Sequence, residues 1–494
     1  MNVVAAPDLA DQLSVDFLAR EPSHLIGDGW VPAKSGRTFP VFNPASGAAI
    51  ANVALGDRHD VDASVQSARR ALVGPWSRLP HAERARLLFN LADLVEARAD
   101  ELALIETLDN GKPFHHARTV DIPSAVEDLR ELAGWATKLV GEAHRVPAGT
   151  VHAYTVREPV GVAALIVPWN FPFMIAVSKI ASALAAGCTA ILKPAEQTPL
   201  SAFVLGDLLL EVGFPEGVVN IVTGDGDTGA ALVEHPDVDM ISFTGSTEVG
   251  KAIIRAAAGN LKRVTLELGG KSPVVIFPDA DLERAIEGAA NGIFFNSGQV
   301  CVANSRLYAH RKVFDRVLEG LAERAKTIKV GSGIDPDTEM GPLVSAEQVE
   351  RVSSLLAAGE REGATTVVGG NRLDRKGFFV EPTVLVDARP DMQIMREEIF
   401  GPVISSSSFD DDDLDTIASE ANNTAYGLAA YVWTRDVGTA HKMASKLKAG
   451  TVRVNGGRAP NMPFGGYKQS GWGRENGKAG IEAFTEVKSV VIGL

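Results

Sequence analysis

Residues 159–178 read PVGVAALIVPWNFPFMIAVS, and this uncharged stretch decides the fold. It is long enough to span a bilayer as one helix. Pro159, Pro168 and Pro172, however, would interrupt the backbone hydrogen bonding of such a helix at three places. The stretch therefore predicts a buried strand, a tight turn and a helix instead of a membrane span.

The same stretch opens a strand–helix–strand unit. We expect a strand over 162–167, a turn at PWNFP, a helix over about 173–186 and a second strand over 189–192. Short β-branched runs alternate with helical patterns through much of the chain, which predicts an α/β protein with parallel sheets. The other expected strands cover residues 218–222, 240–244, 273–277, 403–409, 431–433 and 451–455.

The length of 494 residues suggests roughly three domain-sized units. We place the main boundary at LELGGK, residues 266–271, where glycines follow a long run of strand–helix units. Residues 135–153 and 486–494 carry strand-like pieces that belong to neither block, and edge strands or subunit contacts are expected there. The run of Ser405–Ser408 followed by Asp410–Asp413 is interpreted as a solvated loop or a helix start.

Charge and composition narrow the possible partners. The chain has 48 basic and 62 acidic residues, a formal charge of -14, and it has no Lys/Arg-rich tract. Nucleic acid and anionic membranes are therefore not expected as partners. The first nineteen residues contain Asp8, Asp11 and Asp16 but no Lys or Arg, so we expect neither a secretory signal nor a transit peptide and predict a cytoplasmic protein.

The two cysteines occupy contrasting settings. Cys188 lies in the apolar stretch ALAAGCTAIL and is predicted to be a core residue, whereas Cys301 lies in NSGQVC, a small, polar setting that suits a reactive thiol. In a reducing compartment both are expected to be free. The ten histidines, including His115 and His116, lack zinc-ligand spacing, so no metal is predicted.

A formal G-x-G-x-x-G motif occupies Gly224–Gly229, after an expected strand and before an apparent helix. A dinucleotide fingerprint also needs an acidic residue at the end of the following strand. Here that strand ends in FTGS, without an acid. Phosphate contact and a simple glycine turn therefore both remain open as interpretations of the motif.

Better candidates for a nucleotide site follow two other strands. Glu196, after the strand 189–192, is placed to accept both ribose hydroxyls and to repel a 2′-phosphate, which favours NAD over NADP. Ser246 opens a helix whose free N–H groups attract anions. Taken singly, Ser246 also fits an ordinary helix cap, and Glu196 with Lys193 fits a surface ion pair.

Together these stretches resemble the aldehyde dehydrogenase superfamily from about Asn43 to Ile492. Seven motifs in order carry the resemblance: PWNFP (168–172), KPAEQTP (193–199), FTGSTEVG (243–250), LELGGKSP (266–273), GQVC (298–301), EEIFGPV (397–403) and PFGGYKQSGWGRE (463–475). The resemblance implies a Rossmann-like parallel-sheet cofactor domain over 1–134 and 154–266 and a second α/β catalytic domain over 267–477. It also implies a small β oligomerisation arm over 135–153 and 478–494, through which homodimers or homotetramers form.

The resemblance assigns catalytic roles to four residues. Cys301 is implied as the nucleophile, and the Asn170 amide with the Cys301 backbone N–H as the donors that stabilise the oxyanion. Glu267 is implied as the general base that activates water to hydrolyse a thioester, and Lys179 as a support of the charge network near the thiol. Taken alone, Asn170 also fits a turn residue and Glu267 an ion-paired carboxylate.

The resemblance also assigns binding residues. Those implied for the cofactor are Trp169, Lys193, Glu196, Gly226, Gly245, Ser246, Gly250, Leu268, Glu398 and Phe400. The implied aldehyde tunnel is lined by Phe171, Met174, Val300, Val302, Arg458 and Phe464, with Phe173, Ser178 and the 456–462 loop beside them.

The mostly apolar lining predicts an apolar aliphatic or aromatic aldehyde, oxidised to the acid with NAD. Arg458 leaves a second substrate class open, because an arginine there could bind a substrate carboxylate and favour a semialdehyde, or it could turn to solvent. Three rival functions are a CoA-acylating dehydrogenase, a thiol esterase without redox chemistry and a structural or binding protein that has lost catalysis. The presence of Glu267 disfavours the CoA-acylating enzyme, and the retention of Cys301, Glu267 and Asn170 disfavours an inactive protein.

Overall fold

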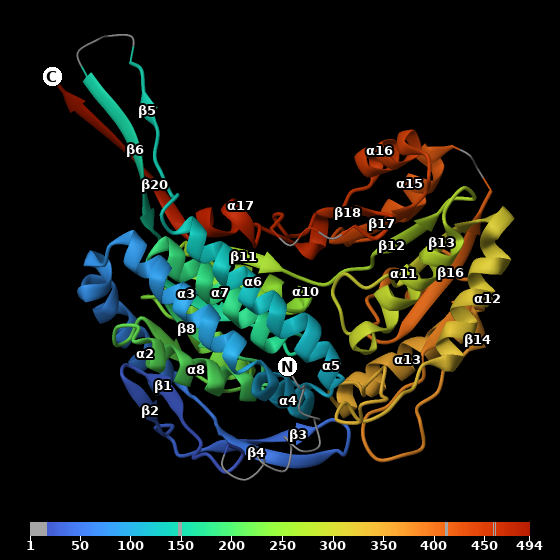
Figure 1. Cartoon of the computed structure of the whole chain (residues 1–494), viewed down its shortest axis with the longest axis horizontal. Coiled ribbons are helices and arrows are strands. Elements are labelled where there is room, and N and C mark those ends of the chain that lie inside the picture. Colours follow the sequence, from blue (N-terminus) through green and yellow to red (C-terminus); the bar gives the residue numbers. More distant parts are fainter. Residues whose placement is uncertain (1–16, 147–150, 411–412, 458, 460) are drawn as a thin grey trace.

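The computed structural model describes residues 17–146, 151–410, 413–457, 459 and 461–494. Two large sheets, each covered by helices, lie side by side, and a narrow three-stranded sheet projects from the molecule (Figure 1). The predicted α/β class with parallel sheets is confirmed. Within the described ranges, each helix is too short or too polar to cross a membrane.

The first sheet has eight strands, of which the central five are parallel. Its strand VAALI is completely buried, as expected for a parallel strand covered on both faces. In spatial order the strands are β19 (Gly471–Trp472), β11 (Arg263–Glu267), β10 (Met240–Thr244), β7 (Val162–Ile166), β8 (Thr189–Lys193), β9 (Val219–Ile221), β1 (His24–Ile26) and β2 (Gly29–Val31).

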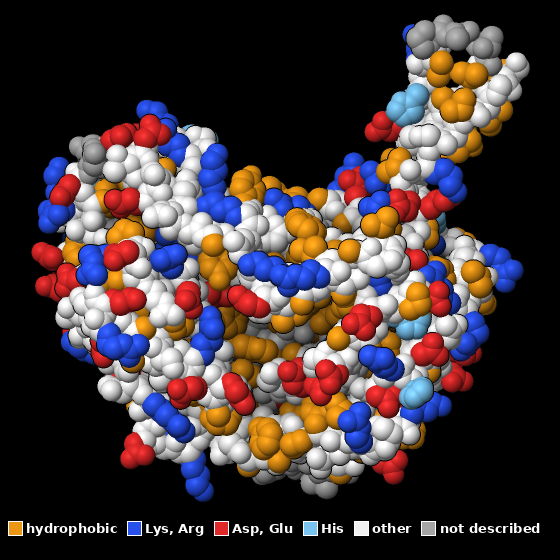
Figure 2. Space-filling view, turned by 180° about the vertical axis from the view of Figure 1, so that it is seen from behind, with side chains coloured by type: hydrophobic (Ala, Val, Ile, Leu, Met, Phe, Trp, Pro, Cys, Tyr) orange, Lys and Arg blue, Asp and Glu red, His pale blue; other side chains and the backbone are white. Residues whose placement is uncertain are grey.

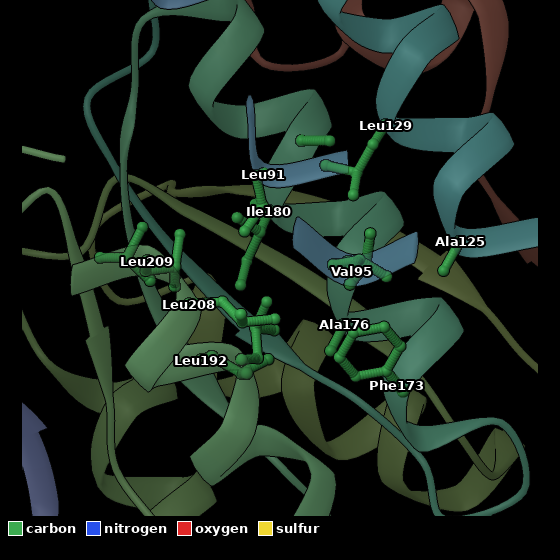
Figure 3. Packing of buried hydrophobic residues seen from close by; sticks show 14 of the residues in the cluster. Leu91, Val95, Ala125, Leu129, Phe173, Ala176, Ile180, Leu192, Leu208 and Leu209 are labelled. Carbon is green, nitrogen blue, oxygen red and sulfur yellow. The ribbon is translucent and has the colours of Figure 1, made fainter. Parts of the chain in front are cut away.

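Alternate residues of β7 pack into different cores. Ala163 and Leu165 join one cluster with α3 (His81–Ala97), α6 (Ile122–Trp135), α7 (Pro172–Ala186) and α8 (Leu200–Val212), part of which is shown in Figure 3. Val162, Ala164 and Ile166 join the opposite cluster with α2 (Arg58–Val73), α9 (Gly226–Glu234) and α10 (Thr247–Ala257). The helices therefore cover both faces of the sheet.

The local sequence explains the limits of α7. Pro172 occupies its first turn, where the missing N–H costs no hydrogen bond, and Gly187 ends it in the left-handed conformation with φ 96°. Almost every α7 residue between them is buried. The predicted strand, turn, helix and strand over 162–192 are thus confirmed.

The second sheet has seven strands and is also covered on both faces. In spatial order they are β14 (Thr365–Val368), β15 (Thr383–Val386), β16 (Val403–Phe409), β13 (Arg306–His310), β12 (Pro273–Ile276), β17 (Ala429–Trp433) and β18 (Thr451–Val454). One face packs on α11 (Leu282–Phe294) and α12 (Arg311–Thr327), and the other on α13 (Ala346–Glu362), α15 (Leu414–Asn422) and α16 (Val437–Lys446).

Smaller elements complete the chain. The projecting sheet consists of β20 (Thr485–Gly493), β6 (Val151–Pro159) and β5 (Ala143–His144). The others are β3 (Thr38–Asn43), β4 (Ala48–Ala54), α4 (Ala99–Asn110), α5 (Phe114–His116), α14 (Gln393–Arg396), α17 (Gly477–Glu482) and the short helical turns Pro75–Arg78, Ala117–Asp121, Phe295–Gly298 and Lys468–Ser470.

One prediction in this part of the chain is wrong. Residues 405–408 do not form a solvated loop, because they lie in β16 between β13 and β15, where Ser405 and Ser406 are buried. The small serine side chains fit into this buried strand, whose backbone forms hydrogen bonds with β13 on one side and β15 on the other. The helix start is correct, since Asp413 caps α15 by accepting a hydrogen bond from the N–H of Asp415 at 3.1 Å. Residues 411 and 412 lie outside the described ranges.

The three-part division stays a proposal. The expected strands in 218–222, 240–244, 273–277, 403–409, 431–433 and 451–455 are present, divided between the two large sheets on either side of 266–271. However, β19 returns from the far part of the chain to pair with β11. The sequence interpretation did not anticipate β11, β13, β14 or β15.

Candidate active site

The candidate site lies at the carboxyl ends of the parallel strands of the first sheet. The turn carrying Asn170 follows β7, whereas Lys193, Thr244 and Glu267 are the last residues of β8, β10 and β11. Parallel strands bring their carboxyl ends to one edge, where open α/β sheets bind ligands. Figure 2 shows hydrophobic side chains gathered in a central hollow on one face of the molecule, with charged side chains around it.

The 168–171 turn contains no glycine and is held by hydrogen bonds from distant residues. The Asn110 side chain donates to the Trp169 carbonyl at 2.8 Å. Lys112 Nζ and Asn296 Nδ2 each donate to the Asn170 carbonyl at 3.0 Å. These bonds fix the turn from behind and leave the Asn170 side chain free to point elsewhere.

The Asn170 side chain meets the loop that carries Cys301. Its buried Nδ2 donates to the Gln299 carbonyl at 3.0 Å, two residues before the thiol. Gly298 is required in this loop, since its φ is 71° and a Cβ there would lie 2.0 Å from the Gly401 carbonyl oxygen. The structure thus brings the predicted amide donor to the loop of the predicted nucleophile.

The two cysteines differ as the sequence predicts. Both are free, Cys188 is fully buried, and Cys301 is partly exposed. Burial in the site, with smaller effects of the Glu398 and Glu267 carboxyls, raises the pKa of the Cys301 thiol to about 12. The thiol of the isolated chain is therefore protonated at neutral pH, and reaction as a thiolate requires a base.

Glu267 has an unusual environment for a carboxyl group. It is 2% exposed, and within the described part of the chain neither carboxyl oxygen has a hydrogen-bonding partner. Burial and then the nearby Glu475 raise the pKa of Glu267 well above its usual value, against the opposing effects of Lys179 and Arg474. Buried carboxyls are normally satisfied, so this one is a candidate for chemistry.

Lys179 lies on α7 close to that carboxyl. Its buried ammonium forms an ion pair with Glu475 and donates to Ser242 Oγ at 2.8 Å. Lys179 thus lies in a buried charge network with Glu475 as its partner. Glu475 ends the PFGGYKQSGWGRE motif, so its position there was the available signal.

The carboxyl ends of β8 and β10 present polar groups that fit a dinucleotide. Lys193 Nζ lies 3.3 Å from the Glu196 carboxylate, whose side chain remains 41% exposed. The Thr244 hydroxyl is buried and has no partner among the described residues. Ser246 caps α10 by accepting from the Val249 N–H at 3.3 Å, and the first-turn N–H groups of that helix suit an anion.

Glycines near this edge serve different purposes. A Cβ on Gly224 would lie 2.0 Å from Thr228 Oγ1, and one on Gly245 would lie 2.4 Å from the Phe243 ring, whereas Gly226 faces open space. Gly250 lies against Leu268, since a Cβ there would be 2.8 Å from its side chain. The acidic N-cap of α9, Asp225, favours the glycine-turn interpretation of 224–229 over phosphate contact.

The segment 397–402, between α14 and β16 of the second sheet, contacts the 168–171 turn through Phe400. Glu398 Oε1 accepts from the Gly270 N–H at 2.8 Å, and burial raises the pKa of this carboxyl to about 7. The Phe400 ring meets the Trp169 ring edge-to-face at 5.2 Å. Phe400 and Trp169 are therefore neighbours, and Glu398 lies two residues before Phe400 along the chain.

A cavity of about 590 Å³ opens beside α7 and contains two of the predicted tunnel residues, Met174 and Phe464. Phe171 instead stacks on Phe295 with ring centroids 6.3 Å apart. Val300 packs against the core formed with α11 and α12, and the Val302 carbonyl accepts from the Tyr431 hydroxyl at 2.8 Å. Arg458 lies outside the described residues.

The sequence interpretation missed the polar members of this cavity. They are Ser124 and Asp128 on α6, Thr451 and Arg453 on β18, and Asn476 before α17. Ser124 and Asp128 are four residues apart on one helix and so share a face. That spacing was the only available signal.

Comparison with known proteins gives a consistent result. The model of the aldehyde dehydrogenase family matches residues 30–490. Phenylacetaldehyde dehydrogenase of Pseudomonas fluorescens is 46% identical over 97% of both chains, and an aldehyde dehydrogenase of Enchytraeus buchholzi is 48% identical over 100% of this chain and 99% of its own. The NAD+ complex of an aldehyde dehydrogenase from Bacillus cereus superposes with a TM-score of 0.96 at 48% identity, covering 100% of both chains.

Proposed function

The chain belongs to the aldehyde dehydrogenase family, and we propose that the Cys301 thiol begins the reaction by attacking the aldehyde. The enzyme uses NAD to oxidise aldehydes to carboxylic acids. The observation that carries the proposed mechanism is the meeting of the Asn170 amide, the loop of Cys301 and the Glu267 carboxyl, which has no partner among the described residues, at one sheet edge.

In the first step the Cys301 sulfur bonds to the carbonyl carbon, and negative charge moves to the oxygen. The Asn170 amide and the Cys301 backbone N–H stabilise that oxyanion, and loss of one such donor typically raises the barrier by about 3–4 kcal/mol. The thiol proton passes to a base, for which Glu267 is the neighbouring carboxyl. Oxidation of this thiohemiacetal leaves a thioester on Cys301.

Glu267 then acts on water. Its deprotonated carboxyl takes a proton from a water molecule, whose oxygen attacks the thioester carbon and displaces the Cys301 sulfur, releasing the acid. The absence of any described hydrogen-bonding partner supports this role, because no bond must be broken before the carboxyl can turn toward water. Lys179, paired with Glu475, limits the accumulation of negative charge nearby.

Bound NAD supplies the hydride acceptor. We assign the adenosine and pyrophosphate half to Trp169, Lys193, Glu196, Gly226, Gly245, Ser246, Gly250 and Leu268, and the nicotinamide half to Glu398 and Phe400. Within the first group Gly226 is assigned to the adenosine, because the acidic Asp225 disfavours a phosphate beside it. The exposed Glu196 carboxylate would repel a 2′-phosphate, so we expect a preference for NAD over NADP.

The substrate is an aldehyde with an apolar aliphatic or aromatic body. The cavity beside α7 supports this class, because Met174, Val452, Val454, Met462 and Phe464 supply much of its lining. A semialdehyde held through Arg458 is the second candidate.

Assembly and location belong to the same proposal. The projecting sheet exposes apolar side chains on β20, with Val487 56%, Val491 65% and Ile492 46% exposed. Exposed apolar patches commonly mark protein interfaces, so we propose a homodimer or homotetramer formed through this arm. We also propose a cytoplasmic enzyme, consistent with its two free thiols.

Replacing the nucleophile tests the mechanism. Cys301→Ser is expected to abolish NADH formation with any aldehyde while NAD still binds, measured by calorimetry on the same preparation. Cys188→Ser is the matched control, because the buried Cys188 lies away from the edge and should leave turnover in place. Retained turnover in Cys301→Ser would refute the proposed nucleophile.

A further inference from the structure

Among its described lining residues, the cavity beside α7 has one acidic side chain. Asp128 enters from α6, Met174 from α7, Arg453 from β18 and Phe464 from the loop after β18. Helices α6 and α7 pack against each other, so Asp128 faces residues of α7 across the helix pair. The carboxyl is part of a mostly apolar wall rather than of the outer surface.

Two routes connect this cavity to the proposed reaction centre. Met174 lies in the first turn of α7, which begins two residues after Asn170, so this part of the cavity wall follows the oxyanion donor closely along the chain. On the other wall, the Arg453 guanidinium lies 5.9 Å from the centre of the Tyr431 ring, and the Tyr431 hydroxyl bonds to the Val302 carbonyl beside Cys301. An aldehyde that reaches Cys301 would therefore place its remote end in this cavity.

Asp128 lacks a charged partner in the described part of the chain. Its carboxyl interacts with the Ser178 hydroxyl, whose single proton is donated either to this carboxyl or to Asn476 Oδ1, 3.2 Å away. The charged groups that act on it most strongly are the carboxyls of Glu131, Glu127 and Glu475, and burial followed by these carboxyls raises the pKa of Asp128 to about 7. The carboxyl thus keeps unused hydrogen-bonding capacity toward the cavity.

Most of the remaining wall offers no such group. Met174, Val452, Val454, Met462 and Phe464 fit the body of an apolar substrate, and Arg453 carries donors only. A ligand that fills this space gains apolar contact along its length and meets a few polar side chains, of which Asp128 is the one carboxyl among the described lining residues. Specificity in such pockets comes from a few placed polar groups.

We propose that Asp128 is a specificity residue that accepts a hydrogen bond from a hydroxyl or N–H group at the end of the substrate remote from its aldehyde. Ser178 and Asn476 hold the carboxyl in place. The proposal rests on the proposed function and narrows its substrate class to apolar aldehydes that carry a neutral hydrogen-bond donor at the far end.

The test compares two aldehydes that differ by one hydroxyl, phenylacetaldehyde and 4-hydroxyphenylacetaldehyde, as kcat/KM with NAD. We expect Asp128→Leu to lower the ratio of the hydroxylated to the plain substrate about tenfold, the effect of one lost hydrogen bond. Asp128→Asn keeps an acceptor of the same size and should lose less. Glu127→Leu is the matched control, because Glu127 immediately precedes Asp128 on α6 but is exposed and does not line the cavity, so the ratio should stay unchanged.

Each other outcome has a distinct meaning. An unchanged ratio in Asp128→Leu with an unchanged melting temperature overturns the proposal, as does an equal loss for both substrates. A third arm uses an aldehyde of similar length with a trimethylammonium group, which has charge but no donor. If Asp128→Leu lowers kcat/KM more for that substrate than for the hydroxylated one, the proposal is also overturned, because Asp128 would then recognise a positive charge instead of a hydrogen-bond donor.

A second readout separates this proposal from the proposed function. If wild-type enzyme oxidises neither aldehyde, the proposed function fails, but phenylacetate and 4-hydroxyphenylacetate can still be titrated into the protein by calorimetry. Tighter binding of the hydroxylated acid that disappears in Asp128→Leu supports the role of Asp128. Equal binding of the two acids by wild-type protein rejects it.

Discussion

Two buried clusters of charge contact α7 and differ in how completely their polar groups are satisfied. In the first, Lys112 forms ion pairs with Asp121 and Glu106 and donates to the Asn170 carbonyl. Glu106 in turn accepts from the Phe173 N–H at 2.9 Å and from Ser201 Oγ at 3.1 Å. In the second, Lys179 is paired with Glu475, but the neighbouring Glu267 carboxyl has no described partner.

The difference teaches how the same chemistry serves two purposes. A network in which each carboxyl has at least one partner fixes its members, and the Lys112 cluster, in which only Asp121 Oδ1 lacks a described partner, fixes the turn that presents the Asn170 amide. An unsatisfied carboxyl costs stability, yet it remains able to turn and to exchange a proton. We therefore assign structural support to the Lys112 cluster and proton transfer to the Glu267 cluster.

Glu267→Gln should give the largest effect. The amide has the same size but cannot act as a base, so steady-state turnover should fall roughly 10²–10⁴-fold while the fold remains stable. Hydride transfer precedes hydrolysis, so a rapid-mixing experiment should show NADH formation of about one per active site, at a rate below that of the wild-type first turnover because Glu267 also takes the thiol proton. Turnover equal to that of wild type, or a loss of this first NADH together with the steady state, would contradict the role in hydrolysis.

Lys112→Met should act on the other cluster and on stability. The substitution leaves Asp121 and Glu106 buried without their cation, and breaking a buried pair in this way typically costs about 3–5 kcal/mol. Denaturant unfolding of the two variants side by side measures the difference. If Lys112→Met is as stable as Glu267→Gln, the Lys112 cluster does not support the fold more than the Glu267 cluster does, and the assignment of structural support to it is wrong.

Much of the candidate site could be predicted from local sequence. Pro168 and Pro172 bracket Asn170 at the end of a strand, and LELGG ends another, so their shared sheet edge follows from the parallel topology. The supporting groups could not be predicted in the same way. Glu475 meets Lys179 across 296 positions of sequence, and its pairing depends on the return of the chain along β11.

Contacts between residues that are distant in sequence also explain why Lys112 and the cavity residue Asp128 were missed. Lys112 donates to a carbonyl 58 positions away, and Asp128 faces a cavity whose opposite wall lies on β18. Each looks like an ordinary charged residue near or on a helix until α6, α7 and β18 are packed together. Spacing along one helix indicates a shared face, but it does not identify what that face meets.

The pH dependence of stability should show the smallest effect and distinguishes the two clusters most directly. The folded-state pKa of Glu267 is raised above its unfolded value, so the folded chain binds this proton more tightly. Its favourable contribution is complete below the unfolded pKa, about 4.3, and is lost as pH rises through the folded pKa. Glu267→Gln lacks this loss and should gain stability relative to wild type, by at most about 1.4 kcal/mol per pH unit.

Asp121, in the Lys112 cluster, also contributes to the pH dependence of stability, but over a narrower pH range than Glu267. Burial raises its pKa to about 6 despite Lys112, so its own loss of stability ends near that pH. This loss of stability from Asp121 occurs in wild type and in Glu267→Gln alike. It therefore cancels when the unfolding free energies of the two proteins are subtracted, as do the contributions of Asp128 and Glu398. Unfolding free energies measured from pH 4 to 8 should therefore diverge progressively, with Glu267→Gln becoming the more stable. Parallel curves would mean that Glu267 has a solvated or partnered carboxyl, and the comparison between satisfied and unsatisfied clusters would fail.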